Sequence, residues 1–397
     1  MPKLLQIDSC RGILSTGRIS EQIGILARKN GWDTYIAHGA RYVGPSGMKS
    51  YQVSSKIGEY LHFAKSVLWD LHGLGSTAQT KKLIKWIDKI KPDIIHLHCI
   101  HGYYLNYKIL FEYLNSTNIP VVWTFHDCWA FTGHCAHFFN AGCEKWKEGC
   151  RNCPLLKEYP RAMIDNSDRN YKLKKKLFEE NPNLHIVSVS EWLSSLVQES
   201  FLKETDNMVI NNGIDINTFS PSQSSGEKPY ILGVASSWNQ SKGLFDFYKI
   251  REKLSEEEYD IIIVGLTKEQ IQDLPRGIKG VSRTESVSAL AELYSGAFAF
   301  VNPTYADSFP TVNMEALACG TPVITYRTGG SPEIIDESSG IVVEQGDVGA
   351  IVEAIKHLED VPIASEVCRQ RAVSLYNKEE RFMDYIRLYE QILNEKK

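Results

Sequence analysis

The chain has 397 residues, of which 43% are hydrophobic and 23% charged, a balance typical of a globular protein. This length exceeds what one ordinary hydrophobic core organises, so two domains are expected. The net charge of −4 argues against a nucleic-acid-binding surface. No apolar run approaches the roughly 18 residues of a membrane-spanning helix, and the N-terminus MPKLLQIDSC is typical of a first strand rather than a signal peptide. We therefore expect a cytoplasmic protein.

Short β-branched segments alternate with helical patterns through the first half of the chain. The predicted strands are Lys3–Ile7, Thr34–His38, Ile94–Leu97, Val121–Phe125, Ile186–Ser190 and Met208–Asn211. The predicted helices between them include Ile19–Asn30, Thr80–Lys91 and Tyr104–Leu114. This alternation predicts a parallel sheet with helices on both faces.

A polar segment rich in turn formers, Asn211–Pro229, is expected to link two domains. After it, strands are predicted at Tyr230–Val234, Asp260–Val264, Phe298–Val301, Pro322–Tyr326 and Gly340–Val343. Helices are predicted at Lys242–Leu254, Val287–Ser295, Thr311–Cys319 and Val348–Leu358. We therefore expect an α/β protein of two doubly wound domains, 1–212 and 213–397, with a Cys-rich insertion at 128–153. The last helix, about 379–394, could pack on either domain.

Two such domains in series are expected to leave a cleft at the carboxyl ends of both sheets, where ligands of this class of fold bind. No G-x-G-x-x-G follows the first strand, which argues against a dehydrogenase-type dinucleotide site.

The most informative segment surrounds the sequence DSFPTVNMEALACG, in which Pro310 fits only the first turn of a helix. Glu315 is the one charge on this otherwise apolar helix, and a buried carboxylate needs hydrogen-bond donors, which a ribose diol would supply. The free N–H groups at Phe309–Val312 would suit a diphosphate, and Asp307 lies just before them. Alternatively, Glu315 bonds backbone groups and Asp307 only caps the helix.

This segment resembles the carboxylate motif of glycosyltransferase family 4, retaining enzymes with the two-domain glycosyltransferase-B (GT-B) fold. The resemblance implies that Glu315 holds the donor ribose and that Asp307 contacts the donor sugar. It also implies that N–H groups of Ser308, Phe309 and Thr311 bind the diphosphate. The family usually has Glu where this chain has Asp307, so the reach to the sugar is shorter by one methylene.

Other segments resemble further parts of the family's donor site. Lys242 matches the lysine of a diphosphate-binding Arg-x4-Lys-Gly, but Ser237 replaces the arginine. Gly17 and Arg18 match a loop near the donor phosphates or the acceptor, and the backbone at Ser282–Arg283 would frame the base. The alternative for Lys242 is a solvated surface lysine. For Gly17 and Arg18 it is a plain tight turn, and for Ser282–Arg283 it is ordinary loop chemistry.

Histidines follow two of the predicted strands. His126 ends Val121–Phe125 and matches a family histidine beside the reacting sugar carbon, so it is the main catalytic candidate together with Asp307. His98 and His101 either line an acceptor pocket or simply pack. A metal site there is the weaker interpretation, since no acidic ligand neighbours them.

Five cysteines crowd into 128–153, and Cys150-x2-Cys153 has the spacing of a zinc knuckle. Cys135 and Cys143 could complete a structural four-thiolate zinc site; disulfides and free buried thiols are the alternatives. The cysteines resemble those of a subgroup of bacterial capsule and colanic-acid glycosyltransferases. The basic amphipathic segment Tyr171–Phe178 is either a contact with an anionic membrane surface or a solvated helix.

These features predict a retaining glycosyltransferase of surface polysaccharide biosynthesis. Its donor would be a UDP- or GDP-linked sugar, and its acceptor a glycan or a polyprenyl-diphosphate-linked glycan, at the inner face of the plasma membrane. No D-x-D occurs, so no metal or other cofactor is expected in catalysis. A sugar-nucleotide epimerase of the same fold and a non-catalytic sugar-nucleotide-binding protein remain alternatives.

Overall fold

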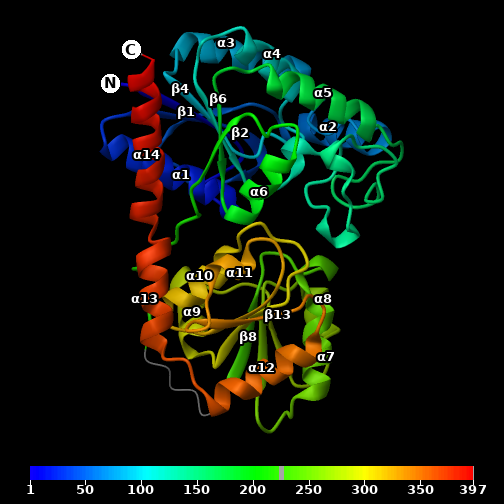
Figure 1. The fold of residues 1–397 in the computed structure, drawn as a ribbon, viewed down its shortest axis with the longest axis vertical. Helices are drawn as coiled ribbons and strands as arrows, with labels where there is room; N and C mark the ends of the chain where they lie inside the picture. The colour runs from blue at the N-terminus through cyan, green and yellow to red at the C-terminus, as the bar shows by residue number, and fades with distance from the viewer. Residues whose placement is uncertain (223–227, 397) are drawn as a thin grey trace. The chain divides into compact units, whose positions relative to one another are not determined.

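The computed structural model describes residues 1–222 and 228–396, which form two units (Figure 1). Unit 1 comprises Met1–Asn211 and Phe382–Lys397, and unit 2 comprises Asn212–Arg381. Both units are α/β, and the sheets of both are parallel throughout.

Unit 1 contains a seven-stranded sheet in the order β3-β2-β1-β4-β5-β6-β7. The strands are β1 (Lys3–Arg11), β2 (Asp33–Val43), β3 (Lys49–Gln52), β4 (Ile94–Leu97), β5 (Val121–Phe125), β6 (Leu184–Ser188) and β7 (Asp206–Val209). Its helices include α1 (Leu14–Lys29), α2 (Lys56–Trp69), α3 (Thr77–Ile90), α4 (Tyr107–Asn115), α5 (Ser167–Glu179) and α6 (Glu191–Glu199). Every residue of β4 and β5 is buried, because helices cover both faces of the sheet.

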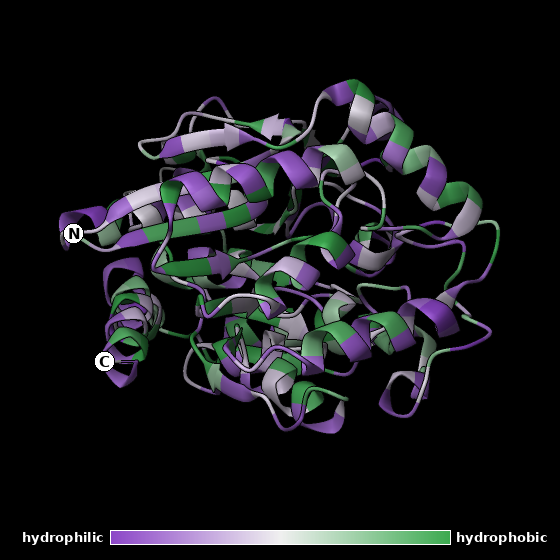
Figure 2. Ribbon diagram, turned by 90° about the horizontal axis from the view of Figure 1, so that it is seen from above, coloured by the Kyte–Doolittle hydropathy of each residue, from purple (hydrophilic) through white to green (hydrophobic). Residues whose placement is uncertain are grey.

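Unit 2 contains a six-stranded sheet in the order β10-β9-β8-β11-β12-β13. The strands are β8 (Tyr230–Val234), β9 (Asp260–Val264), β10 (Ile278–Val281), β11 (Ala299–Asn302), β12 (Val323–Tyr326) and β13 (Gly340–Val343). The helices are α7 (Leu244–Lys253), α8 (Lys268–Gln272), α9 (Val287–Gly296), α10 (Thr311–Ala318), α11 (Ser331–Ile334), α12 (Val348–Asp360) and α13 (Ser365–Tyr376). Along the helices of both units, hydrophilic and hydrophobic residues alternate within a turn (Figure 2), as expected for helices with one face on a sheet.

The strand order reverses beside the first strand of each unit, between β1 and β4 and between β8 and β11. In open α/β sheets the loops that leave the carboxyl ends of two such strands diverge and form a binding crevice. The predicted fold class, two doubly wound parallel-sheet domains, is confirmed.

The last helix, α14 (Lys378–Glu395), contributes mainly to the core of unit 1 (Figure 1). Phe382, Tyr385 and Tyr389 pack in one cluster with residues of β1 and β4. The Tyr389 hydroxyl lies 2.6 Å from Nδ1 of His96, whose Nε2 lies 2.8 Å from Thr124 Oγ1.

The segment predicted as a linker is mostly part of unit 2 where it is described. Ile214 pairs with Asn377, and the carbonyls of Ile216 and Phe219 both accept from the Arg369 guanidinium. Residues 223–227 of the predicted linker lie outside the described residues.

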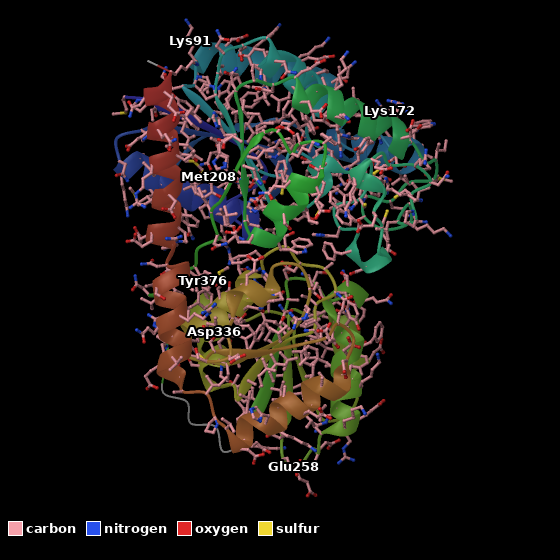
Figure 3. The ribbon with its side chains drawn as sticks, viewed as in Figure 1. Lys91, Lys172, Met208, Glu258, Asp336 and Tyr376 are labelled. Atoms are coloured by element: carbon pink, nitrogen blue, oxygen red, sulfur yellow. The ribbon has the colours of Figure 1, made fainter. Side chains whose placement is uncertain are left out.

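The amphipathic segment Tyr171–Phe178 does not offer an apolar face to a membrane. It lies in α5, where Tyr171, Leu177 and Phe178 are buried and only the polar side is exposed, as Lys172 illustrates (Figure 3). Within the described ranges, no helix is both long and apolar enough to cross a membrane.

Candidate functional site

The reversal of strand order in unit 2 brings together two loops far apart in sequence. The loop after β8 carries Lys242 and the loop after β11 carries Asp307, and Lys242 Nζ lies 2.6 Å from Asp307 Oδ2. The same ammonium donates to the Ala306 carbonyl at 3.2 Å. Gly243, at φ 75°, allows this approach, because a Cβ there would lie 2.1 Å from the Pro303 carbonyl oxygen. The predicted diphosphate lysine and the first acid of the motif are therefore direct partners.

Helix α10 begins beside this ion pair, and its first turn has no side-chain cap. Pro310 occupies the N-cap position and no side chain caps the helix, so its first N–H groups lack a capping acceptor. Asp307 Oδ1 accepts from Phe309 N at 3.3 Å. Ser308 is only 3% exposed, and its hydroxyl has no hydrogen-bond partner in the described structure. An unsatisfied buried hydroxyl beside free amides is an arrangement that a polar ligand would complete.

Glu315 lies one turn further along α10, on the same face as Thr311, and both are partly exposed. Its Oε2 accepts from the Tyr294 hydroxyl of α9 at 3.1 Å. Burial and the charge of Glu315 raise the pKa of Tyr294, so this hydroxyl remains a donor. Helix α10 is buried, as expected of an apolar helix: Asn313, Met314, Ala316, Leu317 and Ala318 are buried, and none of its residues is fully exposed. Ser282 and Arg283 are exposed directly after β10.

In unit 1, a chain of hydrogen bonds orients His126 after β5. Gln6 Nε2 donates to the Ser20 carbonyl at 2.7 Å, which directs Gln6 Oε1 to Nε2 of His98 at 3.0 Å. His98 Nε2 therefore carries a proton, and its Nδ1 accepts from Nε2 of His126 at 3.3 Å. Burial lowers the pKa of His126 to about 4, so the imidazole is neutral at pH 7 and its lone pair is on Nδ1.

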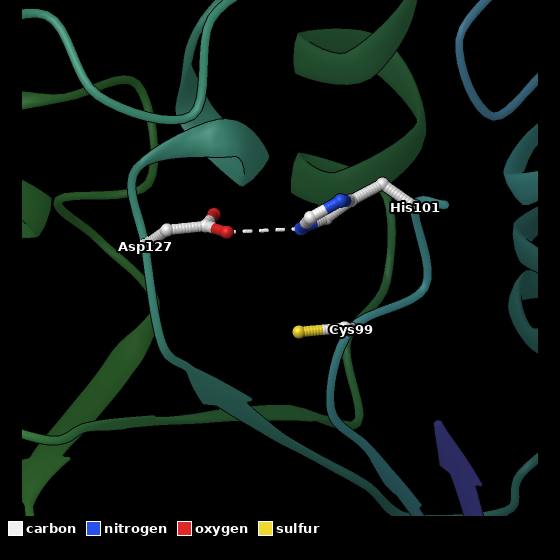
Figure 4. Close-up of side chains that lie close together, drawn as sticks. All are labelled: Cys99, His101 and Asp127. Carbon is white, nitrogen blue, oxygen red and sulfur yellow. Dashed lines mark hydrogen bonds and ion pairs between the residues drawn. The ribbon is translucent and has the colours of Figure 1, made fainter. Parts of the chain in front are cut away.

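Asp127 accepts a hydrogen bond from His101 beside His126, with Asp127 Oδ2 2.9 Å from His101 Nε2 (Figure 4). Burial would raise the pKa of Asp127, but His101 holds it below its usual range. The Cys99 sulfur completes a group whose ligand atoms lie within 4.8 Å of one another, the one such metal-capable group in the described chain. The expectation that no acid neighbours these histidines was wrong, since β4 and β5 are adjacent. Burial raises the pKa of the Cys99 thiol, which disfavours the thiolate that a metal would need.

Gly17 and Arg18 are not in a loop, as predicted, but within α1, which already begins at Leu14. A Cβ on Gly17 would lie 2.9 Å from Cys10 Cβ, so this glycine allows α1 to pack closely against β1. Arg18 is exposed on the same helix.

The four candidate zinc ligands, Cys135, Cys143, Cys150 and Cys153, line one small pocket. No three of their sulfurs gather within 4.8 Å in the described structure, and none is in a disulfide. Gly133 N donates to Cys150 Sγ at 3.1 Å, and a contact with the Cys135 thiol lowers the pKa of Cys153 to about 7. The buried Lys174 Nζ donates to the carbonyls of residues 129 and 132 beside this pocket, and burial lowers the pKa of Lys174 to about 7. The amide donor favours a thiolate at Cys150, whereas burial raises the pKa of the same thiol to about 11.

Comparison with known proteins adds to this geometry. The sequence model described as "Glycosyl transferases group 1" matches residues 228–360, and that of "Glycosyltransferase Family 4" matches residues 28–218. The chain belongs to the family 4 and group 1 glycosyltransferases. It is 26% identical over 329 residues to WcaC of Escherichia coli, described as a colanic acid biosynthesis glycosyl transferase, covering 76% of this chain and 77% of that protein. It is also 26% identical over 189 residues to the O-antigen chain mannosyltransferase RfbU of Salmonella typhimurium, covering 45% of this chain and 52% of RfbU.

Solved structures share the GT-B fold of this glycosyltransferase. Sucrose-phosphate synthase of Thermosynechococcus elongatus aligns with TM-score 0.76 and 17% identity, covering 99% of this chain and 100% of that one. HepE of Anabaena, solved with UDP and glucose, aligns with TM-score 0.67 and 14% identity, covering 98% and 99%.

Two partners in these sites were not predicted. Tyr294 lacks a sequence signal, because nothing in its helix distinguishes it from an ordinary core tyrosine. Gln6 lies in the middle of a strand, where only the neighbouring His98 shows that its amide is used.

Proposed function

We propose that the chain transfers a sugar from a UDP- or GDP-linked donor to a glycan or a polyprenyl-diphosphate-linked glycan, with retention of anomeric configuration. The reaction would serve surface polysaccharide biosynthesis at the cytoplasmic face of the membrane. The observation that carries the proposal is the uncapped start of α10, with Lys242, the unsatisfied Ser308 hydroxyl and Glu315 around it.

The donor diphosphate would accept hydrogen bonds from the N–H groups of Ser308, Phe309 and Thr311. Lys242 would exchange its contact with Asp307 for a phosphate oxygen, because the leaving group carries more charge than one carboxylate. Asp307 would then be free to accept from hydroxyls of the donor sugar. Because Ser237 replaces the arginine of the motif, Lys242 is the one cation that the motif supplies at the start of this helix.

The nucleoside would be held by Glu315, which accepts from the two ribose hydroxyls while Tyr294 donates to the same carboxylate. The backbone at Ser282–Arg283 would frame the base. From unit 1, neutral His126 would hydrogen-bond the donor sugar beside the reacting carbon, with Gly17 and Arg18 near the phosphates or the acceptor. The tautomer of His126 matters here, since its Nδ1 can only accept a hydrogen bond, and so would pair with a sugar hydroxyl that donates.

Transfer would follow from charge stabilisation rather than from a protein nucleophile. Bond breaking at the anomeric carbon places negative charge on the departing diphosphate, where the helix N–H groups and Lys242 stabilise it. The acceptor hydroxyl would attack from the same face and give its proton to that diphosphate, which retains the anomeric configuration.

We also propose that the four cysteines hold a structural zinc ion, which would tether the 128–153 segment. The shared pocket and the amide donor to Cys150 support this proposal.

The test of the function is incubation with a panel of UDP- and GDP-linked sugars, with and without candidate glycan acceptors. Release of free UDP or GDP that increases with an acceptor is expected. Conversion of the donor to an isomer without release would favour the epimerase. Tight binding without either reaction would leave only a sugar-nucleotide-binding protein, and both outcomes would refute the proposed transfer.

A further inference from the structure

Helix α2 presents its apolar side to solvent and its polar side to the protein. The side chains that it buries are Glu59, His62 and Ser66. Its exposed large side chains are Ile57, Tyr60, Leu61, Phe63, Leu68 and Trp69. Ile57 is 75% and Leu61 59% exposed, values far above those of an ordinary apolar helix face. The usual orientation of an amphipathic helix on a domain is thus reversed.

The reversed orientation is held by specific bonds on the buried side. Glu59, 2% exposed, accepts from Ala40 N and the Ser54 hydroxyl. His62 Nε2 accepts from Gly75 N at 2.9 Å, and its Nδ1 lies 3.0 Å from Ser76 Oγ. These partners lie on other elements, so rotating α2 to bury its apolar stripe would break several buried hydrogen bonds.

The exposed stripe is continuous. Ile57, Leu61, Ala64 and Leu68 recur at spacings of three and four residues, which places them along one face of the helix. Ala64 is half-buried and the other three are exposed. The stripe extends onto a neighbouring segment, because Met163 N donates to the Val67 carbonyl at 2.7 Å. Met163 and the following Ile164 are also exposed.

The exposed charges on α2 itself have one sign. Lys56 and Lys65 are exposed and fall on opposite sides of the stripe, because 3.6 residues complete a helical turn. The helix has one acidic residue, Glu59, which is buried and also lies 3.5 Å from Arg41 Nε. Tyr60 and Trp69 add amphipathic rings of the kind enriched where hydrocarbon meets water.

We infer that α2 docks the protein on an anionic lipid surface, with the stripe (Ile57, Leu61, Ala64 and Leu68) in the acyl boundary and both lysines at the headgroups. An apolar stripe flanked by cations and interfacial aromatic residues is the arrangement of a helix that lies in a membrane interface. The surface is separate from the donor groups of unit 2, so this inference does not depend on the proposed sugar transfer.

The test is co-sedimentation of the full chain with vesicles. Phosphatidylglycerol–phosphatidylethanolamine vesicles should bind it, and pure phosphatidylcholine vesicles should bind it at least about tenfold more weakly, since each juxtamembrane lysine contributes to binding anionic lipid. The triple variant Ile57→Ser/Leu61→Ser/Leu68→Ser should weaken binding at least about tenfold, from the lost apolar burial. Its thermal midpoint should match wild type, because all three side chains are exposed.

Two controls separate this surface from others. Val361→Ser/Val373→Ser/Leu375→Ser removes as many exposed apolar side chains from unit 2 and should leave vesicle binding unchanged. Lys56→Gln/Lys65→Gln should lower affinity for the anionic vesicles only.

The inference is overturned if wild type binds neither vesicle, or if the triple variant binds as wild type does. It is also overturned if light scattering shows a dimer that the triple variant converts to a monomer, since the stripe would then join two copies of the chain.

Discussion

Replacing Glu315 by Gln tests the proposed ribose contact with little change in shape. The amide keeps one oxygen that can accept from the Tyr294 hydroxyl, now 3.1 Å from Oε2. It removes the negative charge and replaces the other carboxylate oxygen by an NH2 donor. A hydrogen bond to a charged group contributes about 1.5–3 kcal/mol and a neutral one about 0.5–1.5 kcal/mol. Two ribose hydroxyls would therefore lose about 2–3 kcal/mol together, which weakens nucleotide binding roughly 30- to 150-fold.

Isothermal titration with UDP, GDP and their sugar conjugates measures this loss. The matched control is Glu292→Gln, which removes an exposed carboxylate from α9, the helix that carries Tyr294, and should bind as wild type does. Both variants should keep the wild-type thermal midpoint. If Glu315→Gln binds the nucleotide with unchanged affinity, Glu315 does not hold the ribose.

Three further predictions concern charge, pH and metal. Lys242→Gln should weaken UDP or GDP binding about tenfold and reduce the salt dependence of binding. The control Lys249→Gln loses only a pair with Asp246 and should bind as wild type does. Equal effects of the two substitutions would contradict the assignment of Lys242 to the diphosphate. Because burial lowers the pKa of His126 to about 4, its contribution to the free energy of unfolding is complete above pH 6.5 and lost as the pH falls from 6.5 toward 4. His126→Gln should therefore lose less stability than wild type between pH 7.5 and pH 5 in urea titrations, and an identical loss would refute the neutral imidazole. Metal analysis of purified protein should find one zinc ion per chain that Cys150→Ser reduces, and a metal-free protein with paired thiols would show disulfides instead.

The sheets were the most predictable part of the molecule. Strands β4, β5, β8, β9 and β13 have the predicted bounds, because each is a short, largely apolar run that ends at or near turn formers or polar residues. The edge strand β3 was not predicted, since its sequence KSYQ is polar and largely exposed. Helix α2 was also missed, because the polar residues that it buries give no sign of a core-facing helix.

The site was predictable residue by residue but not in its contacts. Spacing and resemblance singled out Lys242 and Asp307, yet their direct pairing follows from the reversal of strand order between β8 and β11. The tautomer of His126 depends on Gln6 and His98, which come from two other strands of the sheet. Gly17 resembled a loop glycine because small residues surround it, but its role is close packing of α1 on β1.

The most direct test of the donor site is a crystal structure with a bound UDP- or GDP-linked sugar. The account predicts a diphosphate within hydrogen-bond distance of the N–H groups of Ser308, Phe309 and Thr311, with Lys242 on a phosphate oxygen. Both ribose hydroxyls should donate to Glu315. A nucleotide bound elsewhere in the chain, or bound here with its ribose away from Glu315, would contradict it.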